Sequence, residues 1–335
     1  GEVIGAIYGD RKIGTDIAEG GDQIVGDLEA ALLDVMAGAV SSGMARQRQE
    51  ELRSNFSQFF SQAVAERLEH DEDLLAGREA EVTVMFCDIR GYSTIAERVD
   101  AGVTINWIHD ILTDLSECVT ATDGVLVDYI GDELMAMWGA PAEQPDHAER
   151  ACTAALAMLK RIEPLRERWK EITPNQFGVG IGINTGVAAV GNTGSKIKFK
   201  YGPLGNMVNL ASRVQGITRK LGVAALVTDS TAAVVHETFD LRRLAVVQPL
   251  GFAESVALHE LTGDADDSWR SMASQYESAL HSFEVGNLTD AAQQLATLVH
   301  DHPEDNPSVV LLGRVVEALT RKGEPTSPVW VMESK

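Results

Sequence analysis

A strand that ends on an aspartate constrains this chain more than any other segment. Residues 82–88 read Val-Thr-Val-Met-Phe-Cys-Asp, and the chain then turns through Gly91 into a segment that reads as a helix. An apolar, β-branched run of this kind predicts a buried strand. A carboxylate beside the free backbone N–H groups of a helix start suits a metal ion and a polyphosphate. The segment therefore predicts a strand, a turn and a helix, with a metal and phosphate site at the turn.

Two later segments also carry polar residues at positions where the local structure can be predicted. Residues 129–132 read Tyr-Ile-Gly-Asp and place Asp132 in a tight turn between two apolar strands. Residues 208–213 open a helix in which Asn209 and Arg213 are four positions apart, so both lie on one face. These segments add a second carboxylate and a polar pair to the candidate site.

Taken one at a time, these residues have simpler explanations. Asp88 could be a helix N-cap and Asp132 a turn residue, since aspartate is common in both places. Asn209 and Arg213 could form an exposed helix face. The order and the context of all four residues together favour a shared functional site over coincidence.

Composition excludes several classes of protein. With 335 residues and 44% apolar content, the chain can build one full core with smaller attachments. The balance of 28 Lys+Arg against 50 Asp+Glu gives a net charge of −22, which argues against nucleic acid as a partner. No apolar stretch is long enough to span a bilayer and no signal peptide opens the chain, so a cytoplasmic location is expected. Cys87, Cys118 and Cys152 lack metal-site spacing and are expected to be buried small hydrophobes.

Changes in composition and in the spacing of apolar residues divide the chain into four parts. Residues 1–20 resemble the closing strand of a GAF sensor domain, so an upstream sensor in the same chain is expected. Residues 21–76 have helical spacing and predict a long signalling helix with a break near 41–43. The helix fits a coiled coil that pairs two protomers, and a helix packed on its own domain is the alternative. Residues 77–262 form the main domain, and residues 266–335 predict a helical extension built on a tetratricopeptide-like helix pair.

The main domain alternates strands with helices. Strands are expected at 81–88, 124–130, 133–138, 177–184, 187–191, 225–228, 239–247 and 254–260, and helices near 93–120, 145–170 and 206–220. A strand, helix, hairpin, helix and strand in this order predict an α+β fold with a ferredoxin-like sheet.

The order Asp88, Asp132, Asn209 and Arg213 resembles the active site of the class III nucleotidyl cyclases, over about residues 50–261. Further matches to that family are a Phe-x-x-x-Val-Ala segment at 60–65, a Gly-Asn-x-Gly-Ser loop at 191–195, and Lys198 three positions before Tyr201. The resemblance implies conversion of GTP or ATP to a 3′,5′-cyclic nucleotide and pyrophosphate. It also implies a head-to-tail homodimer with two composite sites.

The resemblance assigns roles to individual residues. Asp88, Asp132 and the backbone carbonyl of Ile89 would hold two divalent cations, Mg²⁺ or Mn²⁺. From the opposite protomer, Asn209 would orient the ribose and Arg213 would neutralise charge on the α-phosphate. The remaining phosphate contacts would come from Arg90, Gly91, Tyr92, Ser93 and Lys198.

Two base-binding positions depart from the adenylyl cyclase pattern, which has lysine at Asp128 and aspartate or threonine at Gly202. Guanine offers N1–H and N2–H₂ to a carboxylate, whereas adenine presents a lone pair at N1, so Asp128 favours GTP slightly. An ATP-specific enzyme is the alternative. Asp128 could also pair with a nearby lysine and contact no base.

A third departure is Leu250, where relatives usually have a phosphate-binding lysine. Lys196, Lys198 and Lys200 could replace that charge, or they could simply be solvated. These departures leave two rival functions open. One is a catalytically silent cyclase-like module, and the other is an interaction protein that binds a partner through its C-terminal helices.

Overall fold

The computed structural model describes residues 27–57, 77–173, 177–195, 200–263, 265–321 and 327–332. It divides into two compact units, Gly1–Gln58 and Phe59–Lys335. The expected sensor strand at 1–20 lies outside the described residues.

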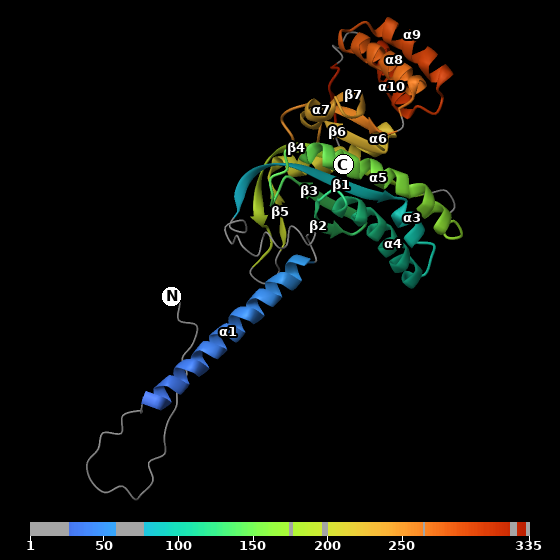
Figure 1. Cartoon of the computed structure of the whole chain (residues 1–335). Coiled ribbons are helices and arrows are strands. Elements are labelled where there is room, and N and C mark those ends of the chain that lie inside the picture. The colour runs from blue at the N-terminus through green and yellow to red at the C-terminus, as the bar shows by residue number, and fades with distance from the viewer. Residues whose placement is uncertain are drawn as a thin grey trace, which may run out of the picture. The chain divides into compact units, whose positions relative to one another are not determined.

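The first unit contributes one helix, α1 (Asp27–Ser57). It runs through residues 41–43 without the break that the sequence suggested (Figure 1). An isolated glycine such as Gly43 costs a helix only about 1 kcal/mol, which a helix of this length tolerates. Apolar side chains of α1, Val35 among them, are exposed in the single chain, and pairing of α1 with a second protomer stays a prediction.

The described residues of the second unit build one nine-stranded sheet. Its strands are β1 (Arg78–Arg90), β2 (Val125–Ile130), β3 (Glu133–Trp138), β4 (Gly178–Asn192), β5 (Tyr201–Leu204), β6 (Ala225–Thr228), β7 (Asp240–Gln248), β8 (Val256–Thr262) and β9 (Trp330–Val331). The order is β2-β3-β1-β4-β6-β8-β7-β9, and β5 pairs with β4. The first four strands in the order β2-β3-β1-β4 form the expected ferredoxin-like α+β arrangement.

The helices of this unit are α3 (Tyr92–Ala96), α4 (Ala101–Thr120), α5 (His147–Arg168), α6 (Asn206–Leu221), α7 (Asp229–Val235), α8 (Asp267–Glu284), α9 (Leu288–Asp301) and α10 (Asn306–Thr320). Side chains alternate along a strand, so β1 presents Met85, Cys87 and Ile89 to the core that α4 and α5 cover. Asp88 therefore points to the other face of the sheet, where α6 lies.

Helix α6 lies unusually close to β4. A Cβ atom at Gly182 would be 2.2 Å from the backbone nitrogen of Gln215, so no side chain fits between strand and helix there. This close approach fixes the position of the helix that carries Asn209 and Arg213.

Several elements differ from the expected ones. The helix expected at 93–120 is two helices, because Asp100 has an extended backbone, with ψ of 147°, and starts α4. The strands expected at 177–184 and 187–191 are the single strand β4, because its pairing with β1 continues through Gly186. Strand β5 and helix α7 were not expected.

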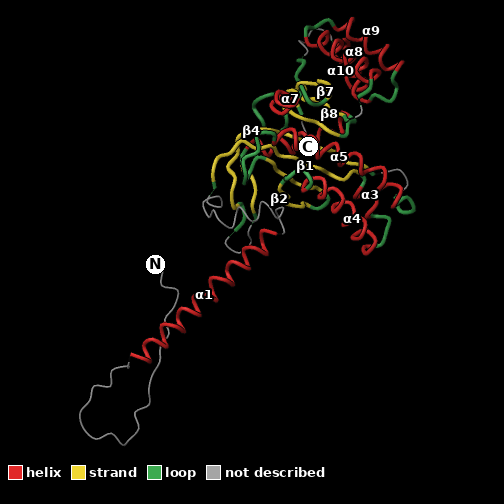
Figure 2. The backbone as a smooth tube through the Cα atoms, in the orientation of Figure 1, coloured by secondary structure: helices red, strands yellow, loops and turns green. Residues whose placement is uncertain are grey.

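The C-terminal segment holds three helices in place of the expected pair. Figure 2 shows α8, α9 and α10 grouped beside the strands β7 and β8. They share a second hydrophobic core with those strands, which includes Leu244, Leu258, Tyr276 and Leu295. Burial of this shared core attaches the helices to the sheet.

Two expectations from composition can be compared with the structure. The cysteines are buried and free, as predicted, and burial raises the pKa of the Cys152 thiol to about 12. Among the helices in the described ranges, none is apolar over the length that a bilayer crossing requires. The cytoplasmic location stays a prediction.

Candidate active site

Asp88 and Asp132 lie near each other, where β1 runs beside the turn between β2 and β3. Pairing of β1 with β3 sets Asp88 opposite Glu133, and the backbone N–H of Ile89 donates to the carbonyl of Asp132 at 3.3 Å. Gly131 makes the turn with a φ of +69°, a conformation that favours glycine. As a result, Asp88 and Asp132 line one cleft of about 310 Å³.

Arginine side chains also line this cleft. Arg219 of α6 places Nη2 3.8 Å from Oδ2 of Asp88, although its own side chain is 74% exposed and the attraction is screened. Arg90 donates from Nη2 to the carbonyl of Val223, and burial, together with the charge of Arg219, lowers its pKa. The cleft therefore combines two carboxylates with cationic groups, a mixture suited to a metal-bound polyphosphate.

The donor set of the cleft fits divalent cations of the Mg²⁺ type. Because the N–H and C=O of a strand residue point to the same side, the carbonyl of Ile89 faces the turn that carries Asp132. Within the described residues, no group of three or more His, Cys, Asp or Glu side chains is arranged to hold a metal. Mg²⁺ is usually bound through one or two carboxylates, with waters and substrate phosphates completing its shell. Two aspartates and one carbonyl match that pattern.

The polar pair on α6 lines a different cavity. Asn209 is exposed and Arg213 is half-buried, and both face a cavity of about 1000 Å³. Residues 250–256 also line this cavity, beginning with Leu250, the residue found where relatives usually have lysine.

A buried network that the sequence analysis missed anchors the start of α6. Asn184 of β4, which is 2% exposed, donates from Nδ2 to the carbonyl of Met207 at 2.8 Å. Its Oδ1 accepts from the hydroxyls of Thr228 at 2.7 Å and Ser230 at 3.1 Å. An asparagine within an apolar strand, with a threonine at the end of another strand and a serine just after it, was the available signal. Asn184 thus holds the first turn of the helix that presents Asn209.

The structure does not bring all four predicted residues into one cavity of the chain. Asp88 and Asp132 line the first cleft, Asn209 and Arg213 line the second, and the two share no lining residue. Helix α6 contributes to both, through Arg219 on the first side and Arg213 on the second. The chain therefore carries two candidate half-sites, one on each side of α6.

The two predicted base-binding positions differ in their surroundings. Asp128 is not buried: its side chain is 38% exposed, and Lys200 donates to its Oδ2 at 2.7 Å. Pairing with a lysine, the alternative considered from sequence, is thus the arrangement within the single chain. Gly202 is buried, and a Cβ atom there would be 2.6 Å from Cγ1 of Val127.

The remaining predicted phosphate contacts follow β1. Gly91 begins α3 with a φ of +88°, Tyr92 stacks on Trp107 with ring centroids 6.1 Å apart, and Ser93 is exposed. Lys196 and Lys198 lie outside the described residues. Lys220, which the sequence analysis did not consider, lines a small cavity with Arg213 and Leu250.

Comparison with known proteins agrees with this geometry. Residues 74–251, more than half of the chain, match the family model described as "Adenylate and Guanylate cyclase catalytic domain". The chain is 32% identical over 183 residues to Adenylate cyclase 1 of Rhizobium meliloti (strain 1021), covering 55% of this chain and 28% of that protein. It is 27% identical over 187 residues to the adenylate cyclase of Anabaena cylindrica, covering 54% of this chain and 36% of that protein. The chain thus spans about a third of the length of these relatives.

Solved structures show the same fold. The adenylyl cyclase CyaB from P. aeruginosa superposes with a TM-score of 0.53 at 26% identity, over 57% of this chain and 98% of that chain. The guanylyl cyclase Cya2 superposes with a TM-score of 0.53 at 24% identity, over 57% of this chain and 96% of that chain. Strand order, half-sites and family match lead to one conclusion: the chain belongs to the class III adenylate and guanylate cyclase catalytic domain family.

Proposed function

We propose that this protein converts a purine nucleoside triphosphate to its 3′,5′-cyclic monophosphate and pyrophosphate, as a head-to-tail homodimer with two composite sites. The observation that carries this proposal is the separation of the half-sites. Asp88 and Asp132 lie in one cleft and Asn209 and Arg213 in another. A second copy that sets its α6 cavity against the carboxylate cleft would complete a site, and two-fold symmetry would form two such sites.

The residues of the first cleft would bind the metal ions and the phosphates of the substrate. Asp88, Asp132 and the carbonyl of Ile89 would hold two divalent cations, Mg²⁺ or Mn²⁺, which supply acidification of the ribose 3′-OH and neutralisation of phosphate charge. The turn from Arg90 to Ser93 would lie along the phosphates, together with Lys198. In the reaction, the 3′-oxygen loses its proton and bonds to the α-phosphorus, and the bond to pyrophosphate breaks.

The residues of the second cavity act on the other side of the substrate. Arg213 would stabilise the negative charge that grows on the α-phosphate oxygens. Asn209 would hold the ribose so that the 3′-oxygen is in line for attack. Asn184 supports both by fixing the first turn of α6 through the carbonyl of Met207.

GTP is the slightly preferred substrate, because the Asp128 carboxylate can accept hydrogen bonds from guanine. An ATP-specific enzyme is the alternative. The ion pair with Lys200 supports a second candidate function, a catalytically silent cyclase-like module, since it occupies a predicted base contact. The upstream sensor also stays a proposal.

A first experiment tests the reaction itself. The full chain is incubated separately with ATP, GTP, CTP and UTP, in Mg²⁺ and in Mn²⁺, and the products are separated by chromatography. Formation of cyclic GMP or cyclic AMP supports the proposal. No cyclic product from a folded dimer would favour the silent module.

A second experiment tests the composite site. Asp88→Asn and Arg213→Ala should each abolish activity, and a mixture should recover about one quarter of the wild-type value. That fraction follows because half of the randomly formed dimers are mixed, and each mixed dimer has one intact site of two. No recovery after proven subunit exchange would overturn catalysis across protomers.

A further inference from the structure

The segment that follows the C-terminal helices returns to the region of Arg213. After α10, strand β9 pairs in parallel with β7, with Trp330 beside Val247 and Val331 beside Gln248. The backbone N–H of Met332 then donates to the carbonyl of Gln248 at 3.0 Å. The chain therefore places its last described residues next to the turn that starts at Pro249.

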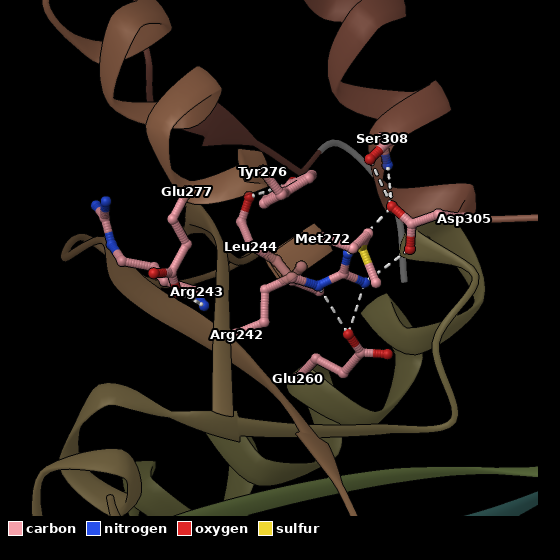
Figure 3. A network of polar contacts seen from close by, with 9 residues as sticks. All are labelled: Arg242, Arg243, Leu244, Glu260, Met272, Tyr276, Glu277, Asp305 and Ser308. Atoms are coloured by element: carbon pink, nitrogen blue, oxygen red, sulfur yellow. Dashed lines mark hydrogen bonds and ion pairs between the residues drawn. The ribbon is translucent and has the colours of Figure 1, made fainter. Parts of the chain in front are cut away.

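A buried ionic network fixes these helices to the sheet (Figure 3). Arg242 of β7 is 1% exposed and donates to Glu260 of β8 and to both carboxylate oxygens of Asp305, at the start of α10. Tyr276 of α8 packs 4.9 Å from the Arg242 guanidinium and donates its hydroxyl to the carbonyl of Leu244 at 2.8 Å. These hydrogen bonds and the shared hydrophobic core hold the three helices against β7 and β8, and removal of either partner of Arg242 alone would leave a buried charge uncompensated.

A second arginine holds strand β9 on this assembly. The guanidinium carbon of Arg314, on α10, lies 5.1 Å from the Phe283 ring centre and 5.0 Å from that of Trp330. Arg314 also donates to the carbonyl of Pro328 at 3.0 Å. The position of Trp330, and with it that of Met332, is therefore set by α8 and α10.

Met332 makes the contact with the half-site. Its side chain, 3% exposed, lines a small cavity together with Arg213, Lys220, Pro249 and Leu250. Lys220 Nζ donates to the Met332 sulfur at 3.7 Å. Arg213 and Lys220 are seven positions apart on α6 and so lie on one face of the helix. Met332 thus packs against the face of α6 that carries both cations.

We propose that Met332 is a positioning residue for the Arg213 half-site, and that the C-terminal helices fix it there through Trp330. In this arrangement Met332 keeps Lys220 and the turn at Pro249–Leu250 in place beside Arg213, so the helical extension is part of the catalytic protomer. Lys220 becomes a candidate source of the positive charge that Leu250 does not provide. The proposal rests on the proposed cyclase function for its kinetic consequence only.

The test compares three variants of the full chain. Met332→Ala removes the side chain but keeps the backbone bond to Gln248, Met332→Leu preserves volume, and Val331→Ala is the matched control, because Val331 is 57% exposed on the same strand. We expect Met332→Ala to raise KM for the nucleotide about 10-fold, since displaced phosphate contacts weaken binding. The melting temperature should fall by a few degrees, because a buried side chain is lost from the second core. Met332→Leu should restore most of the loss, and Val331→Ala should behave as wild type.

A second measurement does not depend on activity. In Met332→Ala, amide hydrogen exchange should become faster at residues 248–252 and in the last turns of α6, but not in α5, whereas Val331→Ala should match wild type. Equal exchange and equal KM in Met332→Ala and Val331→Ala would overturn the positioning role. A wild type that forms no cyclic nucleotide would count against the proposed function alone, because the exchange comparison would still decide the role of Met332.

Discussion

Lys200 Nζ lies 2.7 Å from Oδ2 of Asp128, so the residue predicted to read the base already has a cationic partner within its own chain. Both side chains are about one-third exposed, and the backbone N–H of Tyr129 donates to the other carboxylate oxygen at 3.0 Å. Because a carboxylate offers several acceptor positions, this pairing leaves room for a guanine edge as well. The ion pair is therefore compatible with either base, and kinetic measurements on variants of Asp128 and Lys200 are needed to decide between GTP and ATP.

The first prediction separates a base contact from an internal ion pair. If Asp128 accepts from guanine, Asp128→Asn should lower kcat/KM for GTP about 10-fold or more and leave that for ATP nearly unchanged, since a charge-assisted contact is lost. Lys200→Met should keep or raise the GTP-to-ATP ratio, because the carboxylate loses a competing donor. Asp123→Asn is the control, since Asp123 also forms a surface ion pair, with Arg150 at 2.7 Å. An unchanged ratio in both test variants would place Asp128 outside the base pocket.

The second prediction concerns the carboxylate cleft. Asp88→Asn and Asp132→Asn preserve shape but weaken metal binding, and each should reduce cyclisation at least about 100-fold. The melting temperature and the dimer fraction should stay near wild type, because neither side chain is part of the core. Asp267→Asn, at a fully exposed side chain, serves as the control for loss of one negative charge. Activity within a few-fold of wild type in either cleft variant would remove the metal assignment.

The parts of the site that could be predicted from sequence are those fixed by local structure. Asp88 follows an apolar strand and Asp132 sits in a two-strand turn, so each position can be inferred from its neighbours in the chain. Asn184 and Met332 could not be found in this way. Their roles depend on contacts with Met207, 23 positions away, and with Lys220, 112 positions away.

The same reasoning explains the errors in the fold. Two strands were expected within 177–191, but β4 pairs with β1 without interruption from Gly178 to Val190, and this long-range pairing makes them one strand. A third C-terminal helix and strand β9 were missed because α10 is held by packing on α9 and α8, and β9 by pairing with β7. The alternation of strands and helices in the main domain was strong enough to indicate the ferredoxin-like order.

The third prediction concerns Gly202 and the space around it. A Cβ atom at this position would be 2.6 Å from Cγ1 of Val127, a branched side chain with little freedom to move. Gly202→Ala should therefore lower the free energy of unfolding by about 1–3 kcal/mol, and Val127→Ala in the same chain should relieve part of that cost. Denaturant unfolding of the two single variants and the double variant measures the coupling. Additive effects would show that the two side chains do not compete for space, and an aspartate at 202 would then be tolerated as well.

The fourth prediction concerns the pH dependence of the buried network. Glu260 and Asp305 share one guanidinium, that of Arg242, and burial raises the pKa of the Glu260 carboxyl in spite of its bonds to Arg242 at 2.6 and 2.9 Å. The folded protein therefore holds the Glu260 proton more tightly than the unfolded chain does. The stability that this proton contributes is fully present below the unfolded pKa, about 4.3 for glutamate, and is lost as the pH rises through the folded pKa.

Glu260→Gln cannot titrate and so reports this effect directly. The unfolding free energy of wild type minus that of Glu260→Gln should fall as the pH is raised from 4 to 7, and should level off above the folded pKa. Taking the difference cancels the titration of carboxylates that do not interact with Glu260. Urea unfolding at four or five pH values, with wild type and variant measured side by side, provides the curve. A difference that rises with pH would mean that the ion pair with Arg242 outweighs burial and that the pKa of Glu260 is lowered in the folded protein.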